Sequence, residues 1–157
     1  MQILRHYDHT PEELKDGVVV LGNFDGVHRG HQAVIGEAWA IAKAANAPLI
    51  VLTFEPHPRS FFKPDEASFR LTPFRNKAHH LEALEIDGLV VLSFDETLAG
   101  MEAEDFIQDV LVAGLAARHR AGARLHIDDI DIGVRHRLAG GACAVPHLLG
   151  IDRDGRH

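Results

Sequence analysis

The chain has 157 residues, of which 46% are hydrophobic and 25% charged, so it has the composition of a folded protein with room for one domain. Its formal net charge of -7 argues against a nucleic-acid-binding surface, because affinity for phosphate backbones needs clustered lysine and arginine. Cys143 is the only cysteine and no apolar stretch is long enough to span a bilayer, so we expect a cytoplasmic protein with no intrachain disulfide and no membrane partner.

Strands and helices are predicted to alternate from the first apolar run onwards. Val18–Leu21 is a continuous run of strand formers, typical of a strand buried on both faces. The alanine-rich segment Gln32–Asn46 has helical spacing, and Asn46 followed by Pro48 supplies its end. A second strand is expected at Leu49–Phe54, before Pro56 and Pro58.

The next segment, Arg59–Pro73, is expected to be irregular. Beyond it the pattern predicts a helix at about Phe74–Leu84, a strand at Gly88–Phe94 and a helix at about Ala103–Ala117. This alternation predicts an α/β fold, a Rossmann-like parallel sheet flanked by helices. Ligands of such sheets bind at the carboxyl ends of the strands.

The composition changes after His119. No buried strand is expected from Arg120 on, so we predict one domain over 1–119 and a divergent tail over 120–157. A frameshifted or truncated gene and true divergence both account for such a tail. Its acidic residues are interpreted as solvated rather than as a cation site, because no EF-hand spacing surrounds them: Asp128, Asp129 and Asp131.

The most informative stretch is Gly22–His31, which follows the first strand and opens a helix near Gly30. A helix that starts in a glycine-rich loop presents its first N–H groups to an anion, and Gly30 has no side chain to keep a ligand from the backbone. His28 and His31 straddle the turn and are suited to donate hydrogen bonds to phosphate oxygens. The loop is not a Walker loop, since the Gly-Lys-Ser/Thr ending is missing.

The pattern Gly-x-Phe-Asp-Gly-x-His-x-Gly-His over residues 22–31 resembles the bacterial FAD synthetases, the adenylyltransferase half of bifunctional riboflavin kinase/FMN adenylyltransferases. Two further blocks fit this family in the right order, Thr53–Pro58 and Arg70–Thr72 followed by Lys77. The resemblance runs from roughly Gly17 to His119. It implies that ATP and FMN are the substrates, that Mg²⁺ assists, and that FAD and pyrophosphate are the products.

The resemblance also assigns roles to residues. It implies His28 and His31 as catalytic residues. It places nucleotide and phosphate binding at Gly22, Asn23, Phe24, Asp25, Gly26 and Gly30. It places the flavin side at Pro56, His57, Pro58 and Phe62, with a further role for Lys77.

Each of these residues has a plainer interpretation that stays open. The histidine pair is also compatible with a surface or metal pair. Asn23 and Asp25 are as well suited to cap the turn or helix as to contact ligand, and Phe24 is expected to pack. Phe61 and Phe62 are also compatible with closing a core, and Lys77 with a solvated helix position. His79–His80 is expected to be an exposed helical face, and Glu85 stands where a glycine would ordinarily end the helix.

Two alternatives to FAD synthesis also remain. Later motifs of the family, a Gly-x-Asp-Phe-x-Phe-Gly block and a Ser/Thr-rich element with an arginine, are not found, so a truncated or degenerate member without activity is one alternative. The loop binds phosphate rather than flavin, so a different phosphorylated acceptor is the other possibility. The chain has no room for the family's kinase module, so riboflavin kinase activity is not expected. The sequence does not predict an oligomeric state.

Overall fold

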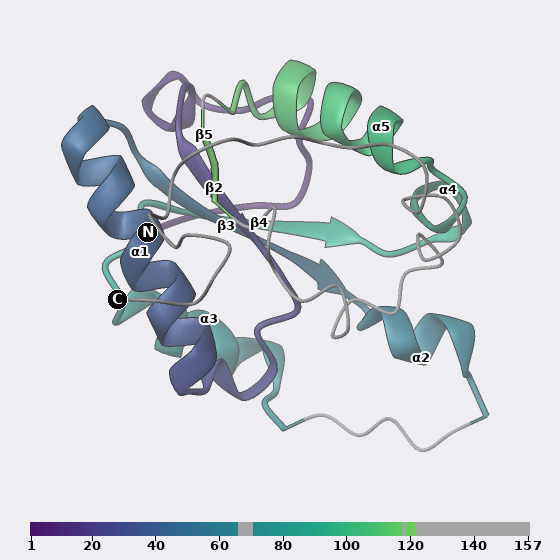
Figure 1. The fold of residues 1–157 in the computed structure, drawn as a ribbon. Helices are drawn as coiled ribbons and strands as arrows, with labels where there is room; N and C mark the ends of the chain where they lie inside the picture. The colour runs from purple at the N-terminus through teal and green to yellow at the C-terminus, as the bar shows by residue number, and fades with distance from the viewer. Residues whose placement is uncertain (66–70, 118, 122–157) are drawn as a thin grey trace, which may run out of the picture.

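The structure, a computed structural model, describes residues 1–65, 71–117 and 119–121. Within these residues the chain forms a five-stranded sheet of order β1-β4-β3-β2-β5, in which every neighbouring pair is parallel (Figure 1). The predicted α/β architecture is thereby confirmed. The strands are β1 (Gln2–Leu4), β2 (Val18–Leu21), β3 (Leu49–Glu55), β4 (Gly88–Ser93) and β5 (His119–Ala121).

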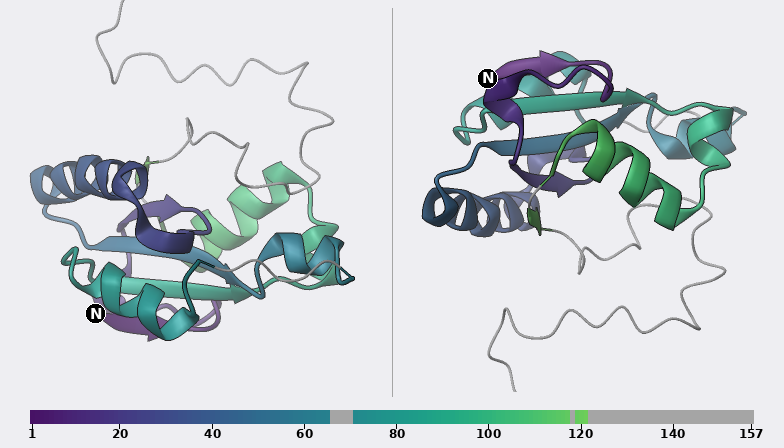
Figure 2. Two further views of the ribbon diagram at one scale, coloured as in Figure 1. Left: turned by 90° about the horizontal axis from the view of Figure 1, so that it is seen from below. Right: turned by 90° about the horizontal axis from the view of Figure 1, so that it is seen from above.

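Helices cover both faces of this sheet (Figure 2). The long helix α1 (Arg29–Ala45) and α3 (Phe74–Glu82) lie on one face, while α5 (Ala103–Asp105) and the π-type helix η3 (Phe106–Gly114) lie on the other. Shorter helical elements are η1 (Glu12–Leu14), η2 (Asp25–Val27), α2 (Pro58–Phe62) and α4 (Glu96–Ala99). None of the helices in the described ranges combines the length and apolar character that crossing a membrane requires.

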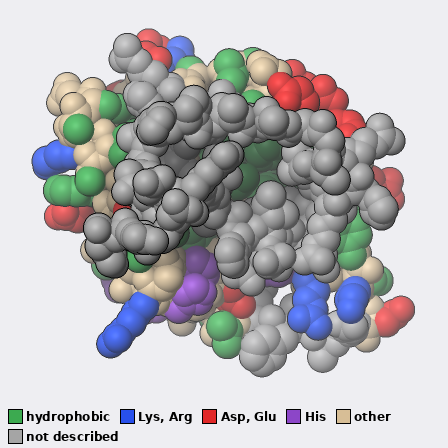
Figure 3. Space-filling model, in the orientation of Figure 1, with side chains coloured by type: hydrophobic (Ala, Val, Ile, Leu, Met, Phe, Trp, Pro, Cys, Tyr) green, Lys and Arg blue, Asp and Glu red, His purple; other side chains and the backbone are tan. Residues whose placement is uncertain are grey.

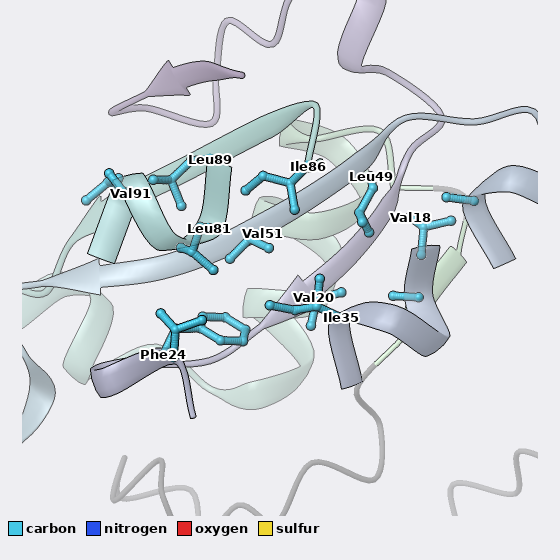
Figure 4. Close-up of a cluster of buried hydrophobic side chains, with 14 residues drawn as sticks. Val18, Val20, Phe24, Ile35, Leu49, Val51, Leu81, Ile86, Leu89 and Val91 are labelled. Atoms are coloured by element: carbon cyan, nitrogen blue, oxygen red, sulfur yellow. The ribbon is translucent and has the colours of Figure 1, made fainter. Parts of the chain in front are cut away.

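The central strands are buried on both faces because their side chains alternate between two apolar clusters. Val18 and Val20 of β2 face the cluster under α1 and α3, whereas Val19 faces the cluster under η3. β3 and β4 continue the same alternation, and Figure 4 shows the first cluster with their side chains directed into it. Full burial of one such aliphatic side chain contributes about 1.5–3 kcal/mol, so these strands contribute much of the fold's stability.

Helix α1 begins and ends as its sequence predicts. Its buried side chains Ile35, Ala38 and Ala42 recur at helical spacing and pack on the sheet. Asn46 adopts the left-handed conformation with φ 49°, and the N–H of Ala47 donates to the carbonyl of Ala42 at 2.9 Å. This is the Schellman arrangement, which satisfies the last carbonyl groups of the helix.

Three local expectations need correction. Part of the segment predicted to be irregular forms α2, which starts at Pro58, a residue whose fixed φ suits the first turn of a helix. The sequence offers no buried strand from Arg120 on, whereas β5 extends to Ala121 and pairs with β2 in the register Val18↔His119. β1 was not predicted, and its three residues pair with β4 at the sheet edge. The expectations for residues 122–157, including Asp128, Asp129 and Asp131, lie outside the described residues.

The segment after α3 carries a measurable strain. Glu85 is exposed and adopts φ 58°, the left-handed region expected from the missing glycine. A non-glycine residue there costs about 1–2 kcal/mol. We expect Glu85→Gly to raise the free energy of unfolding by about 1 kcal/mol, measured by urea denaturation.

The control is Ala83→Gly, two residues earlier, where φ is -65° and glycine brings no relief. We expect this variant to lose up to about 1 kcal/mol. Equal effects of the two substitutions would show that the conformation of Glu85 stores no strain.

Candidate active site

The glycine-rich loop lies where the topology of the sheet reverses. From β2 the chain proceeds through α1 to β3 on one side, whereas β5 lies on the other side of β2. In open parallel sheets, ligands bind at the carboxyl ends of the strands beside this reversal. The loop Gly22–His28 leaves β2 at that edge and enters α1.

Phe24 anchors the loop to the hydrophobic core. Its side chain is fully buried, and Figure 4 shows its ring directed into the cluster that contains Val20 and Ile35. The residue adopts φ 51°. A Cβ atom at Gly22 would lie 3.1 Å from the Phe24 ring, so Gly22 makes room for it. The interpretation of Phe24 as a packing residue is confirmed.

His28 and His31 form a stacked pair at the amino end of α1. Their ring centroids lie 3.7 Å apart with an interplanar angle of 19°. The Nδ1 atom of His28 accepts a hydrogen bond from the N–H of His31 at 3.4 Å, so His28 caps the helix. The His28 ring is exposed, while the half-buried His31 ring meets Phe24 edge-on at 5.1 Å. The two rings therefore differ in environment, and His28 is the more accessible.

The missing side chain of Gly30 leaves room for the His28 ring as well as access to the backbone. A Cβ atom at position 30 would lie 3.2 Å from both Cε1 and Nδ1 of His28. That separation is tighter than ordinary van der Waals contact, so a side chain at position 30 would displace the ring. The sequence interpretation of Gly30 considered only ligand access to the backbone.

Asp25 ties the loop to the segment that precedes α3. Its carboxylate accepts hydrogen bonds from the N–H of Leu71 at 3.0 Å and the N–H of Thr72 at 2.9 Å. The Thr72 hydroxyl also accepts from the N–H of Gly26 at 2.6 Å, and Gly26 holds φ 75°. Asp25 thus joins two loops, and the cap of α1 comes from His28 instead.

These contacts change the acidity of Asp25. Partial burial opposes ionisation of the carboxyl group, but the donors of Leu71 and Thr72, with His57 nearby, outweigh it. The pKa of Asp25 therefore lies below its ordinary value. The carboxylate is held ionised and acts as a fixed acceptor between the loops.

Lys77 lies under the loop rather than in solvent, so the solvated interpretation is wrong. It is only 4% exposed. Its ammonium nitrogen lies 3.1 Å from the carbonyl oxygen of Asn23, 3.3 Å from the Thr53 hydroxyl and 3.3 Å from a Glu55 carboxylate oxygen. The Thr53 hydroxyl also donates to the Asn23 carbonyl at 3.1 Å. The buried Asn23 thus takes part in this network through its backbone.

The turn after β3 lies beside the glycine loop, as Thr53 and the proximity of His57 to Asp25 show. Pro56 is exposed and Pro58 buried, and Nδ1 of His57 accepts from the N–H of Arg59 at 3.1 Å at the start of α2. Phe62 on α2 is 46% exposed, with its ring 5.7 Å from that of Phe94. The alternative that Phe61 and Phe62 close a core is therefore confirmed only in part. Phe61 is half-buried and packs against the cluster under η3, whereas Phe62 keeps an open face.

His28 is exposed at the surface of the described part of the chain. Figure 3 shows histidine side chains gathered near the amino end of α1, basic side chains over α2, and acidic side chains over α5. A cavity of about 410 Å³ lies at the ends of β1 and β4, and one of about 380 Å³ lies between α1 and the end of α3; neither is lined by His28 or His31. His79 and His80 are exposed, as expected.

Sequence reasoning missed Thr53, Glu55 and Thr72 as residues that shape the site. All three lie in blocks that were recognised, but only contacts between segments reveal their roles. The burial of Lys77 had a local signal. It shares a helical spacing with Phe74 and Leu81, which pack against the core, so it lies on the buried face of α3.

The ionised Asp25 makes stability depend on pH. Because its pKa is lowered in the folded state, its contribution is fully present above the unfolded value, about 3.9, and is lost as the pH falls through the folded pKa. We expect the difference in unfolding free energy between wild type and Asp25→Asn to stay constant near neutral pH and to shrink below about pH 4. Urea denaturation over this range measures it. Asp109→Asn, on an exposed residue of η3, is the control, and an identical pH profile for both variants would contradict the role of Asp25.

The chain is similar to known proteins over about three quarters of its length. The model of the FAD synthetase family matches residues 10–122. Bifunctional riboflavin kinase/FMN adenylyltransferase of Escherichia coli is 35% identical over 122 residues, covering 77% of this chain and 39% of that protein. The protein of the same description from Haemophilus influenzae is 38% identical over 112 residues, covering 71% of this chain and 36% of that protein. This chain therefore spans well under half the length of these relatives.

The fold has a counterpart among solved structures. A crystal structure described as a macrolide-efflux protein from Streptococcus pneumoniae superposes with a TM-score of 0.64 at 23% identity, over 76% of this chain and 39% of that chain. At this identity the similarity shows the fold alone. With the family model matched from residue 10 to residue 122, the chain belongs to the FAD synthetase family.

Proposed function

We propose that this chain is an FMN adenylyltransferase that forms FAD and pyrophosphate from ATP and FMN. The observation that carries the proposal is the stacked pair of His28 and His31 at the amino end of α1, beside the reversal of the sheet. Membership in the FAD synthetase family supports the identity of the substrates. The proposal concerns adenylyl transfer alone.

His28 is the donor to the phosphates. Its Nδ1 atom accepts from the N–H of His31, so in the neutral ring the proton resides on Nε2. Nε2–H is then available for a phosphate oxygen. The N–H groups of Arg29 and Gly30 open α1, where no intrahelical acceptor exists for them, and they add to the attraction of an anion.

The reaction needs positioning more than covalent help. A phosphate oxygen of FMN forms a bond to the α-phosphorus of ATP, and the bond from this phosphorus to the oxygen bridging to the β-phosphorus breaks. Pyrophosphate leaves with that oxygen. His28 and His31 stabilise the charge that develops on the phosphate oxygens, and the glycine loop from Gly22 to Gly26 orients the nucleotide.

The flavin side of the site lies along the turn after β3. Pro56 and Pro58 have fixed φ values and enclose His57, whose ring is held by its bond to the N–H of Arg59. The open face of Phe62 offers an apolar surface to a flat ring. These residues form a wall for the isoalloxazine beside the phosphate loop.

Mg²⁺ and cytoplasmic location are further parts of the proposal. Among the described residues there is no group of three histidine, cysteine or carboxylate side chains suited to a metal, and Asp25 is engaged by Leu71 and Thr72. This fits an ion held chiefly by substrate phosphates and water, as Mg²⁺ commonly is. When bound, it would neutralise phosphate charge. The single Cys143 fits a reducing cytoplasm.

The test is an assay of FAD formation from FMN and Mg-ATP by the chain. Chromatography with fluorescence detection measures the product. His28→Ala and His31→Ala should each lower kcat/KM by about 100-fold or more, the loss expected when one donor is removed from a preorganised site. His79→Ala and His80→Ala are matched controls on the exposed face of α3 and should retain wild-type rates.

The other outcomes separate the alternatives. Turnover with CTP or pantetheine phosphate, but not with ATP and FMN, would indicate a different nucleotidyl transfer. No turnover and no rise in melting temperature with Mg-ATP would indicate a degenerate member, because a ligand at 100 times its dissociation constant stabilises a protein by about 2.7 kcal/mol.

A further inference from the structure

The buried ammonium group of Lys77 is an unusual feature of this site. Lysine is rarely placed inside a protein, because removing an ion from water is costly unless charged and polar partners surround it. Among the described residues, oxygen atoms of Asn23, Thr53 and Glu55 lie within hydrogen-bond distance of its Nζ. Each of these oxygen atoms can accept from an N–H donor of the ammonium group. The environment thus suits a charged lysine held in one orientation.

These acceptors belong to different segments of the site. Asn23 lies in the glycine loop after β2, whereas Thr53 and Glu55 lie at the end of β3, directly before the turn with Pro56. Lys77 itself comes from α3. One side chain therefore connects the segment assigned to phosphate with the segment assigned to flavin.

The bond to Asn23 sets the direction of a peptide group. The carbonyl of Asn23 points toward Lys77 and also accepts from the Thr53 hydroxyl. In a planar trans peptide the following N–H points the opposite way, so the N–H of Phe24 is directed away from Lys77. Phe24 then enters its left-handed conformation. Lys77 thereby orients the backbone that leads through Phe24 to His28.

We propose that Lys77 is a positioning residue that holds the glycine loop against the Pro56–Pro58 turn, so that both substrates are aligned through one buried cation. The proposal rests on the proposed function for its kinetic consequence, but its structural content is independent of it. Lys77 is 4% exposed and lies beneath the loop, where its ammonium group contacts the Asn23 carbonyl and the Glu55 carboxylate. The paired carboxylate of Glu55, with an 18% exposed side chain, balances its charge.

The variant that tests this is the pair Lys77→Met with Glu55→Gln, which removes both charges together and leaves no buried carboxylate without its cation. The matched control is Lys15→Met with Glu12→Gln, which removes the exposed ion pair of 2.7 Å near η1. Thr53→Val is a milder second variant, because it removes only the hydroxyl that bridges Lys77 and Asn23.

Two measurements are made on the full chain at a temperature where circular dichroism shows each variant folded. The first is steady-state FAD formation with ATP and FMN varied in turn. We expect kcat/KM for both substrates to fall by about 100-fold in the double variant, with changed KM values, as misplacement by about 1 Å produces. The kcat/KM of Thr53→Val should also fall, but by less, and the kcat/KM of the control should match that of wild type.

The second measurement is amide hydrogen exchange. We expect faster exchange in the peptide that contains Gly22, Gly26 and Val27, whose N–H groups are bonded in the folded loop, with unchanged exchange in β4. Unchanged loop exchange, faster exchange throughout the sheet, or a lower kcat with unaltered KM values would overturn the proposal, because each describes a residue that does not position the loop. A wild-type chain that forms no FAD while the loop exchange responds as stated would refute the proposed function and leave the positioning role supported.

Discussion

The arrangement of this site depends on how the turn after β2 is held. The turn presents several backbone groups at the carboxyl edge of the sheet, where it would otherwise be loosely constrained. It is held from three directions: Phe24 is buried in the core, the Asn23 carbonyl accepts from Thr53 and Lys77, and Asp25 accepts from Leu71 and Thr72. Since α1 begins a few residues later, the position of His28 follows from these contacts.

The energetics explain why a non-glycine residue occupies a strained position in this turn. The left-handed conformation of Phe24 costs about 1–2 kcal/mol. Burying its aromatic side chain contributes about 1.5–3 kcal/mol, so burial outweighs the backbone strain. A glycine at this position would relieve the strain but would lose the anchor. Gly26, which has φ 75° and no side chain to bury, shows the other solution within the same turn.

Polar groups that connect segments have a different role from apolar groups that stabilise layers. The clusters on the two faces of the sheet account for the position of the strands and of α1, α3 and η3. The oxygen and nitrogen atoms around Lys77 and Asp25 contribute less net stability, since their bonds replace bonds to water. Their directionality restricts the loops to one arrangement, which a site for charge stabilisation requires.

Sequence alone determined the alternation of strands and helices, the burial of β2, and the place of His28 and His31 in the glycine-rich loop between β2 and α1. These features are local, because hydrophobic period, turn residues and motif spacing are properties of consecutive residues. The tertiary structure decided that His-Arg-Ala at 119–121 is a strand, since pairing with β2 rather than side-chain hydrophobicity defines β5. It also decided which groups surround Lys77 and that Asp25 joins two loops, because their partners lie 22 or more residues away in the chain.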